Sequence, residues 1–160
     1  MLNREVFDLG MKILLASYPE YQCTPETIEV YWMDLKDFDS KDFERVITNH
    51  RRTQKFFPRI CELREELVQL RGFNRPTAND AWAGLIKAAE SGERPEMDEN
   101  IERALQVCGG WDGFSRMTYR DLQFQRKEFI QVYNAGLERE DRQLKIGQQG
   151  PEQKQIEKVG

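Results

Sequence analysis

The chain has 160 residues, of which 39% are hydrophobic and 32% are charged, and its formal net charge is −4 with an isoelectric point near 5.2. This length fits one domain, or one domain with a small partner and a tail, and the mild acidity argues against sequence-independent attraction to DNA. No apolar run approaches the roughly 20 residues of a membrane span, and three scattered cysteines with one histidine support neither a disulfide framework nor a zinc site.

Apolar residues within the first 72 positions recur at helical spacing and predict four amphipathic helices. Asn3, Thr24 and Asp39 precede three of these segments and are suited to cap them, because their side-chain oxygens accept hydrogen bonds from free backbone amides. Four short helices with short connections predict a compact all-α bundle over residues 1–72. The expected buried faces are Phe7, Met11, Leu14 and Tyr18; Ile28, Tyr31, Trp32 and Leu35; Phe43, Val46, Ile47 and His50; and Ile60, Leu63, Leu67 and Leu70.

A bend is predicted between the third and fourth helices, at Lys55-Phe56-Phe57-Pro58-Arg59. Pro58 disfavours helical dihedrals at Phe57, so the third helix has to end before it. At least one of the two phenylalanine rings is expected to fill the junction between the helices. The residues expected to anchor this junction are Phe56, Phe57, Pro58 and Leu63.

Four cations, Arg51, Arg52, Lys55 and Arg59, flank the two phenylalanines and are called the basic corner. Three interpretations are open: stabilisation of the negative end of a helix dipole, contact with an acidic protein surface, or contact with nucleic acid. A DNA-binding domain usually carries more positive charge over the whole domain, so direct DNA binding is not expected.

The second half of the chain predicts further helices over residues 76–142. A hinge is expected at residues 72–76, because glycine and proline interrupt the periodicity there. Thr77 and Thr118 each have an aspartate three residues later, which is typical of a capping box, and Thr118 opens a long helix. Residues 143–160 are rich in Gln, Gly and Lys and predict a disordered, flexible tail that cannot bury enough apolar surface to fold alone.

The run DFERVITNHRRTQKFFPRICELREEL at residues 42–67 resembles small replication proteins of Gram-positive phages, the helicase loader/inhibitor family. The opening of the chain resembles the same family in its N-terminal helix, its Tyr-Pro turn and its Thr-Pro-Glu-Thr helix start. The resemblance is clearest over residues 1–71 and looser over residues 76–142.

The resemblance implies an adaptor of phage DNA replication that binds a hexameric DnaB-type helicase. Such a protein inhibits the helicase, loads it at the origin, or does both, with an origin-binding initiator protein as a second partner. The alternative is a small DNA-binding replication or regulatory protein. For the helicase contact we expect the tail and the adjoining end of the long helix, with the basic corner as a secondary contact. The apolar candidates are Leu137, Leu144, Ile146, Ile156 and Val159.

No motif in the sequence points to catalysis, a metal or a cofactor. The phosphate-binding pattern GxxxxGK[ST] is absent, and His50 lies on the apolar stripe of its helix, where a packed histidine is expected. The aspartates at positions 37, 39 and 42 lack the glycine and the closing glutamate of a calcium loop. We therefore expect a protein without enzymatic activity that acts in the cytoplasm of the bacterial host cell.

Overall fold

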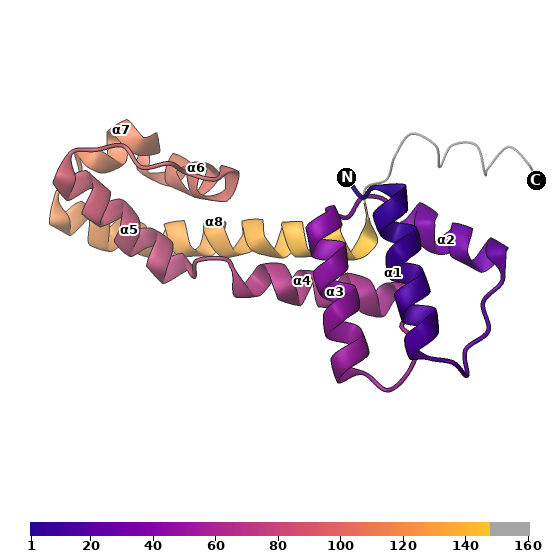
Figure 1. Cartoon of the computed structure of the whole chain (residues 1–160). Helices are drawn as coiled ribbons and strands as arrows, with labels where there is room; N and C mark the ends of the chain where they lie inside the picture. The colour runs from indigo at the N-terminus through magenta and orange to yellow at the C-terminus, as the bar shows by residue number, and fades with distance from the viewer. Residues whose placement is uncertain (148–160) are drawn as a thin grey trace, which may run out of the picture. The chain divides into compact units, whose positions relative to one another are not determined.

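The computed structural model describes residues 1–147, and all regular secondary structure in that range is helical (Figure 1). This confirms the predicted all-α class. None of the described helices is long and apolar enough to cross a membrane. The helices are α1 (Arg4–Ser17), α2 (Pro25–Leu35), α3 (Ser40–Thr53), α4 (Ile60–Phe73), α5 (Ala78–Ser91), α6 (Glu99–Leu105), the 3-10 helix η1 (Gln106–Cys108), α7 (Gly110–Ser115) and α8 (Tyr119–Ile146).

Side-chain caps begin the helices at the predicted positions. Asn3 Oδ1 accepts a hydrogen bond from the backbone amide of Glu5 at 2.8 Å. Thr77 and Asp80 form a reciprocal capping box, with Asp80 N donating to Thr77 Oγ1 at 3.1 Å and Thr77 N donating to Asp80 Oδ2 at 3.2 Å. These hydrogen bonds hold the pKa of Asp80 below its ordinary value, the one from the Thr77 side chain most of all. The other predicted caps that accept such bonds are Thr24, Asp39, Asp98 and Thr118.

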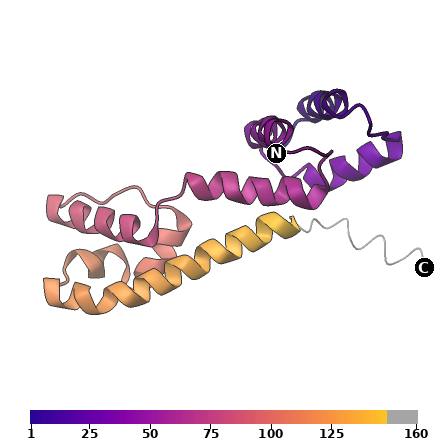
Figure 2. The same ribbon diagram turned by 90° about the horizontal axis from the view of Figure 1, so that it is seen from below.

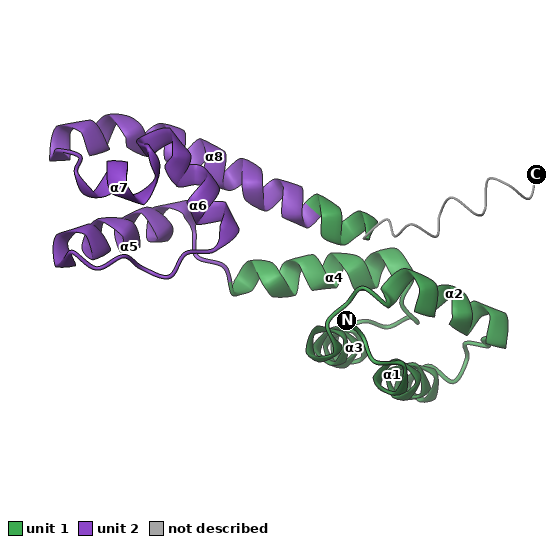
Figure 3. Cartoon of the chain, turned by 90° about the horizontal axis from the view of Figure 1, so that it is seen from above, with its two compact units in different colours: residues 1–74, 142–160 green, residues 75–141 purple. Residues whose placement is uncertain are grey.

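The chain divides into two units (Figure 3). Unit 1 comprises residues 1–74 and the residues from 142 onward, and unit 2 comprises residues 75–141. The break after residue 74 falls in the segment predicted as a hinge. The predicted start of the flexible tail, at 143, falls inside α8, which continues to Ile146. From residue 148 that predicted tail lies outside the described residues.

Unit 1 buries the apolar faces of its helices in one core, and α1 and α3 lie side by side in it (Figure 2). Their close approach depends on Gly10, because a Cβ atom there would lie 2.5 Å from Cε1 of Phe43. The Phe43 ring is fully buried, and its centroid lies 5.7 Å from that of Phe7. The buried core residues are Leu2, Phe7, Met11, Leu14, Tyr18, Tyr31, Leu35, Phe38, Phe43, Val46, Ile47, Leu63 and Leu67.

Unit 2 has its own core, formed around three aromatic side chains from α5, α7 and α8. The Trp82 ring centroid lies 5.2 Å from that of Phe114 and 5.0 Å from that of Phe129. The short helix α7 was not predicted, since Gly109-Gly110 was expected to end a helix. Both glycines do have positive φ, but α7 starts at Gly110 and carries Phe114 into the core.

Candidate functional site

The predicted bend lies between α3 and α4 and is built around Phe57. Its ring stacks on Tyr21 with a centroid distance of 3.9 Å and meets the rings of Tyr18 and Tyr31 at 6.0 Å. The Tyr31 hydroxyl donates to the carbonyl oxygen of the buried Pro58 at 2.8 Å. Burial is the main reason why the pKa of Tyr31 rises to about 12. Phe57 therefore fills the junction through an aromatic cluster.

Phe56 has the opposite placement, so its predicted role as a structural anchor is wrong. Its side chain is 72% exposed, because the backbone at the bend directs neighbouring side chains to different sides. The Phe56 carbonyl oxygen lies 3.0 Å from Nε2 of His50, which holds the backbone of the bend. The ammonium of Lys55 lies 5.7 Å from the centroid of the exposed Phe56 ring.

His50 is buried on α3, as the apolar stripe predicted. Its Nδ1 faces a carboxylate oxygen of Glu66 on α4, and its Nε2 faces the Phe56 carbonyl. The Tyr18 ring packs beside the imidazole with a centroid distance of 6.2 Å. This histidine has structural partners on both ring nitrogens and joins α3, α4 and the bend.

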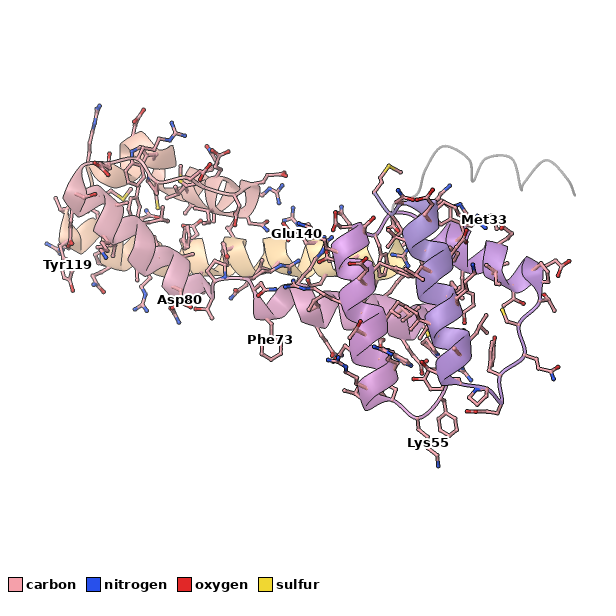
Figure 4. The ribbon with its side chains drawn as sticks, viewed as in Figure 1. Met33, Lys55, Phe73, Asp80, Tyr119 and Glu140 are labelled. Atoms are coloured by element: carbon pink, nitrogen blue, oxygen red, sulfur yellow. The ribbon has the colours of Figure 1, made fainter. Side chains whose placement is uncertain are left out.

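The basic corner is exposed at all four positions. Arg51 and Arg52 lie in the last turn of α3, Lys55 lies in the bend, and Arg59 is the N-cap residue of α4. Figure 4 shows Lys55 projecting away from the bend. Within residues 1–147 the structure records no ion pair for any of the three arginines. The two cations on α3 stabilise the C-terminal end of its dipole, yet their charged groups remain open to a partner.

Comparison with family models found a match for residues 1–64, the segment that contains α1, α2, α3, the bend and the basic corner. The matching model describes the N-terminal domain of the helicase loader/inhibitor of phage SPP1. Residues 1–64 belong to this domain family. The match confirms the resemblance to phage helicase loader/inhibitors for this part of the chain, which is called the matched domain from here on. Comparison with curated proteins found no match, and neither did comparison with solved structures.

Arg64, the last residue of the matched domain, is the one central residue that sequence reasoning did not identify. It is only 6% exposed. Its guanidinium donates to both carboxylate oxygens of Asp37, at 2.7 and 3.3 Å, and to the carbonyl oxygen of Asp34. It also lies over the Phe38 ring, 5.4 Å from the centroid. The only signal in the sequence was an arginine beside the buried Leu63, within an otherwise acidic turn.

Arg64 also holds the end of α8 within unit 1. Its Nη1 donates to the carbonyl oxygen of Leu144 at 2.7 Å, and the Leu144 side chain packs against the unit 1 core. Gly147 follows with φ +83°, and a Cβ atom there would lie 2.7 Å from the guanidinium of Arg64. The last turn of α8 thus completes the core around the matched domain from a position about 80 residues later in the chain.

The apolar residues predicted to bind a partner differ in their placement. Leu137 packs against the core of unit 2 and Leu144 against that of unit 1, so neither is a free surface residue, which corrects the prediction for both. Ile146 is 64% exposed at the end of α8. Ile156 and Val159 lie outside the described residues. Among residues 1–147 no group of three or more His, Cys, Asp or Glu side chains is arranged to hold a metal ion.

Proposed function

We propose that this protein is an adaptor of phage DNA replication that binds a hexameric DnaB-type replicative helicase. It inhibits the helicase, delivers it to an origin-binding initiator protein, or does both, in the cytoplasm of the bacterial host. The observation that carries the proposal is the match of residues 1–64 to the N-terminal domain of a phage helicase loader/inhibitor. Its mechanism is binding and release, with no bond chemistry of its own.

The helicase contact is proposed for the C-terminal segment. Ile146 supports this, because a large aliphatic side chain lies exposed where α8 ends. Ile156 and Val159 enter the proposal through the sequence alone, as apolar points in a polar stretch. Such a segment can cover a large partner while its ordering entropy is lost only on binding.

The basic corner is proposed as a second contact that acts on the rate of association. Exposed cations without intramolecular partners attract an acidic surface over a distance of about 10 Å at moderate salt. Reversing Arg51, Arg52 and Lys55 to glutamate is expected to slow association more than it speeds dissociation. Reversal of three exposed cations elsewhere, Lys12, Lys41 and Arg139, is the matched control. Equal effects of the two triple variants in stopped-flow binding would contradict a specific role of the corner.

The experiment that tests the proposed function is native mass spectrometry of the full chain mixed with a DnaB-type helicase, with and without ATP. A stable complex with the hexamer is expected, and any effect of ATP should come from the helicase, since the chain lacks a phosphate-binding motif. Size-exclusion chromatography at the same concentrations checks the stoichiometry. If no complex forms with a host or a phage helicase under either condition, the proposal is refuted.

A further inference from the structure

The region where α8 begins is basic, although the chain as a whole is acidic. Residues 115–127 contain four basic side chains and one acidic side chain, whereas the formal net charge of the whole chain is −4. The acidic one, Asp121, accepts hydrogen bonds from the backbone and hydroxyl of Thr118, so its carboxylate is engaged in the helix cap. The local excess of positive charge is therefore open to an external partner.

Two cations and an aromatic ring share one outward face of α8. Arg120, Phe124 and Lys127 are spaced i, i+4 and i+7, which places them above one another on a helix. Phe129 and Tyr133 lie on the opposite face and are fully buried in the unit 2 core. The Phe124 side chain is 72% exposed, so this ring contributes little to the core.

A second exposed ring and further cations border this face. Tyr119, the first residue of α8, is 76% exposed and is labelled in Figure 4. On α5, Asn79 accepts a hydrogen bond from Arg126 at 3.1 Å, and Pro76, just before α5, accepts one from Tyr133, so the two helices run antiparallel. The exposed Lys87, eight residues beyond Asn79, therefore lies toward the Tyr119 end of α8.

The cations on this surface have no acidic partner among the described residues. No ion pair is recorded in residues 1–147 for Arg116, Arg120 or Lys127. Glu128 is the nearest acidic residue in sequence, and it follows Lys127 on the flank of the face. Unpaired cations beside exposed rings form a surface suited to a chain of alternating phosphates and flat apolar groups.

We propose that this face of unit 2 binds single-stranded DNA. Phosphates would lie against Arg120, Lys127 and Arg116, and bases would stack on the rings of Phe124 and Tyr119. A duplex fits less well, because its base faces are already stacked inside the helix. The choice of DNA rests on the proposed replication function, since an origin-loaded helicase acts where the duplex is open. This surface is distinct from the basic corner, which belongs to unit 1.

The test is fluorescence anisotropy of the full chain with a labelled oligothymidylate of about 16 nucleotides, without helicase, over a range of salt concentrations. Phe124→Ala is expected to weaken binding at least about fivefold, because one stacked base is lost. Phe124→Tyr keeps the ring and should bind as the parent does. Reversal of Arg120 and Lys127 to glutamate should reduce the slope of log K against log salt by about 1.4.

Arg139→Glu is the matched control, since Arg139 is an exposed cation of the same helix away from this face. The proposal is overturned if the parent shows no binding at low salt, or if Phe124→Ala binds like the parent. Equal losses for Arg139→Glu and Arg120→Glu would overturn it too, as would competition by polyglutamate as strong as that by unlabelled oligothymidylate. The last result would point to an acidic protein surface instead. Helicase binding is measured separately, so failure here leaves the proposed function standing.

Discussion

At the residue scale, Arg64 shows how much of unit 1 depends on one buried charge. The side chain of Arg64 is 8% exposed and that of its partner Asp37 is 17% exposed, so both ions are largely removed from water. Removing one partner of such a pair leaves the other charge uncompensated, which is more damaging than losing an exposed pair. The same helix offers a comparison, because the pair of Arg71 with Asp42 is more exposed, at 37% and 21%.

Arg64→Ala is therefore expected to lower the free energy of unfolding by about 3 kcal/mol, measured by urea denaturation. Arg71→Ala, the control on the same helix, should lower it by less than about 1 kcal/mol. Similar losses for the two variants would show that Arg64 is an ordinary surface cation.

Arg64 also shows a limit of prediction from a single sequence. A helical pattern assigns an arginine within an acidic turn to the solvated face, and the burial of Arg64 depends on Asp37 and Leu144. These partners lie 27 and 80 residues away in the chain, so no local window contains them. His50 could be predicted as buried because it continues a local apolar stripe, while its carboxylate partner on α4 could not.

Tyr31 gives a prediction in alkaline solution. Its pKa is raised to about 12 in the folded protein, against an ordinary value of 10.0, so folding favours the neutral hydroxyl that donates to Pro58. The resulting stability is fully present below about pH 10 and is lost as the pH rises toward 12. Tyr31→Phe should lower the unfolding free energy by about 1 kcal/mol near neutral pH, because it removes the hydrogen bond.

The difference in stability between the parent and Tyr31→Phe should then shrink from about pH 10 to about pH 12, since phenylalanine has no proton to lose. Thermal unfolding followed by circular dichroism at a series of pH values measures this difference. Tyr18 and Tyr133, whose pKa values are also raised mainly by burial, are present in both proteins and cancel. A difference that stays constant over this range would contradict the assignment.

At the element scale, the junction of α3 and α4 depends on one ring of an adjacent pair. The sequence predicted that at least one phenylalanine fills it, because proline forces a bend there, but a bend of irregular backbone has no periodicity to tell which ring points inward. Helix starts were predictable for the opposite reason, since a cap such as Asn3 acts within two residues of itself. The break between α6 and α7 failed because glycine permits a turn without preventing a new helix.

Phe57→Ala is expected to lower the free energy of unfolding by about 3 kcal/mol, because it removes the ring that contacts Tyr18, Tyr21 and Tyr31. Phe56→Ala, one position earlier, should change it by no more than about 0.5 kcal/mol, since that ring is 72% exposed. Chemical denaturation of the two variants side by side makes the comparison. The placement of the rings is refuted if Phe56→Ala is the more damaging change.

At the scale of the whole molecule, the end of α8 belongs to the unit that begins the chain. The sequence predicted a polar segment from residue 143 onward because charged and amide side chains dominate it, and the contribution of Leu144 was hidden by that composition. The apolar contact becomes visible only when α4 and the last turn of α8 are seen together in unit 1. A cut inside residues 142–147 and a cut after them should therefore have different effects.

A chain that ends at Gly147 keeps every contact described for unit 1, so its melting temperature should equal that of the full chain. A chain that ends at Asp141 loses the Leu144 side chain from the core and the carbonyl that Arg64 Nη1 contacts. Unfolding of unit 1 in this shorter chain should be easier by about 2 kcal/mol. Both truncated chains should bind a DnaB-type helicase more weakly than the full chain, because both lack Ile156 and Val159. Calorimetry measures the stability and native mass spectrometry the complex. If the chain ending at Gly147 binds as tightly as the full chain, the helicase contact has to lie on the exposed surfaces of the folded helices.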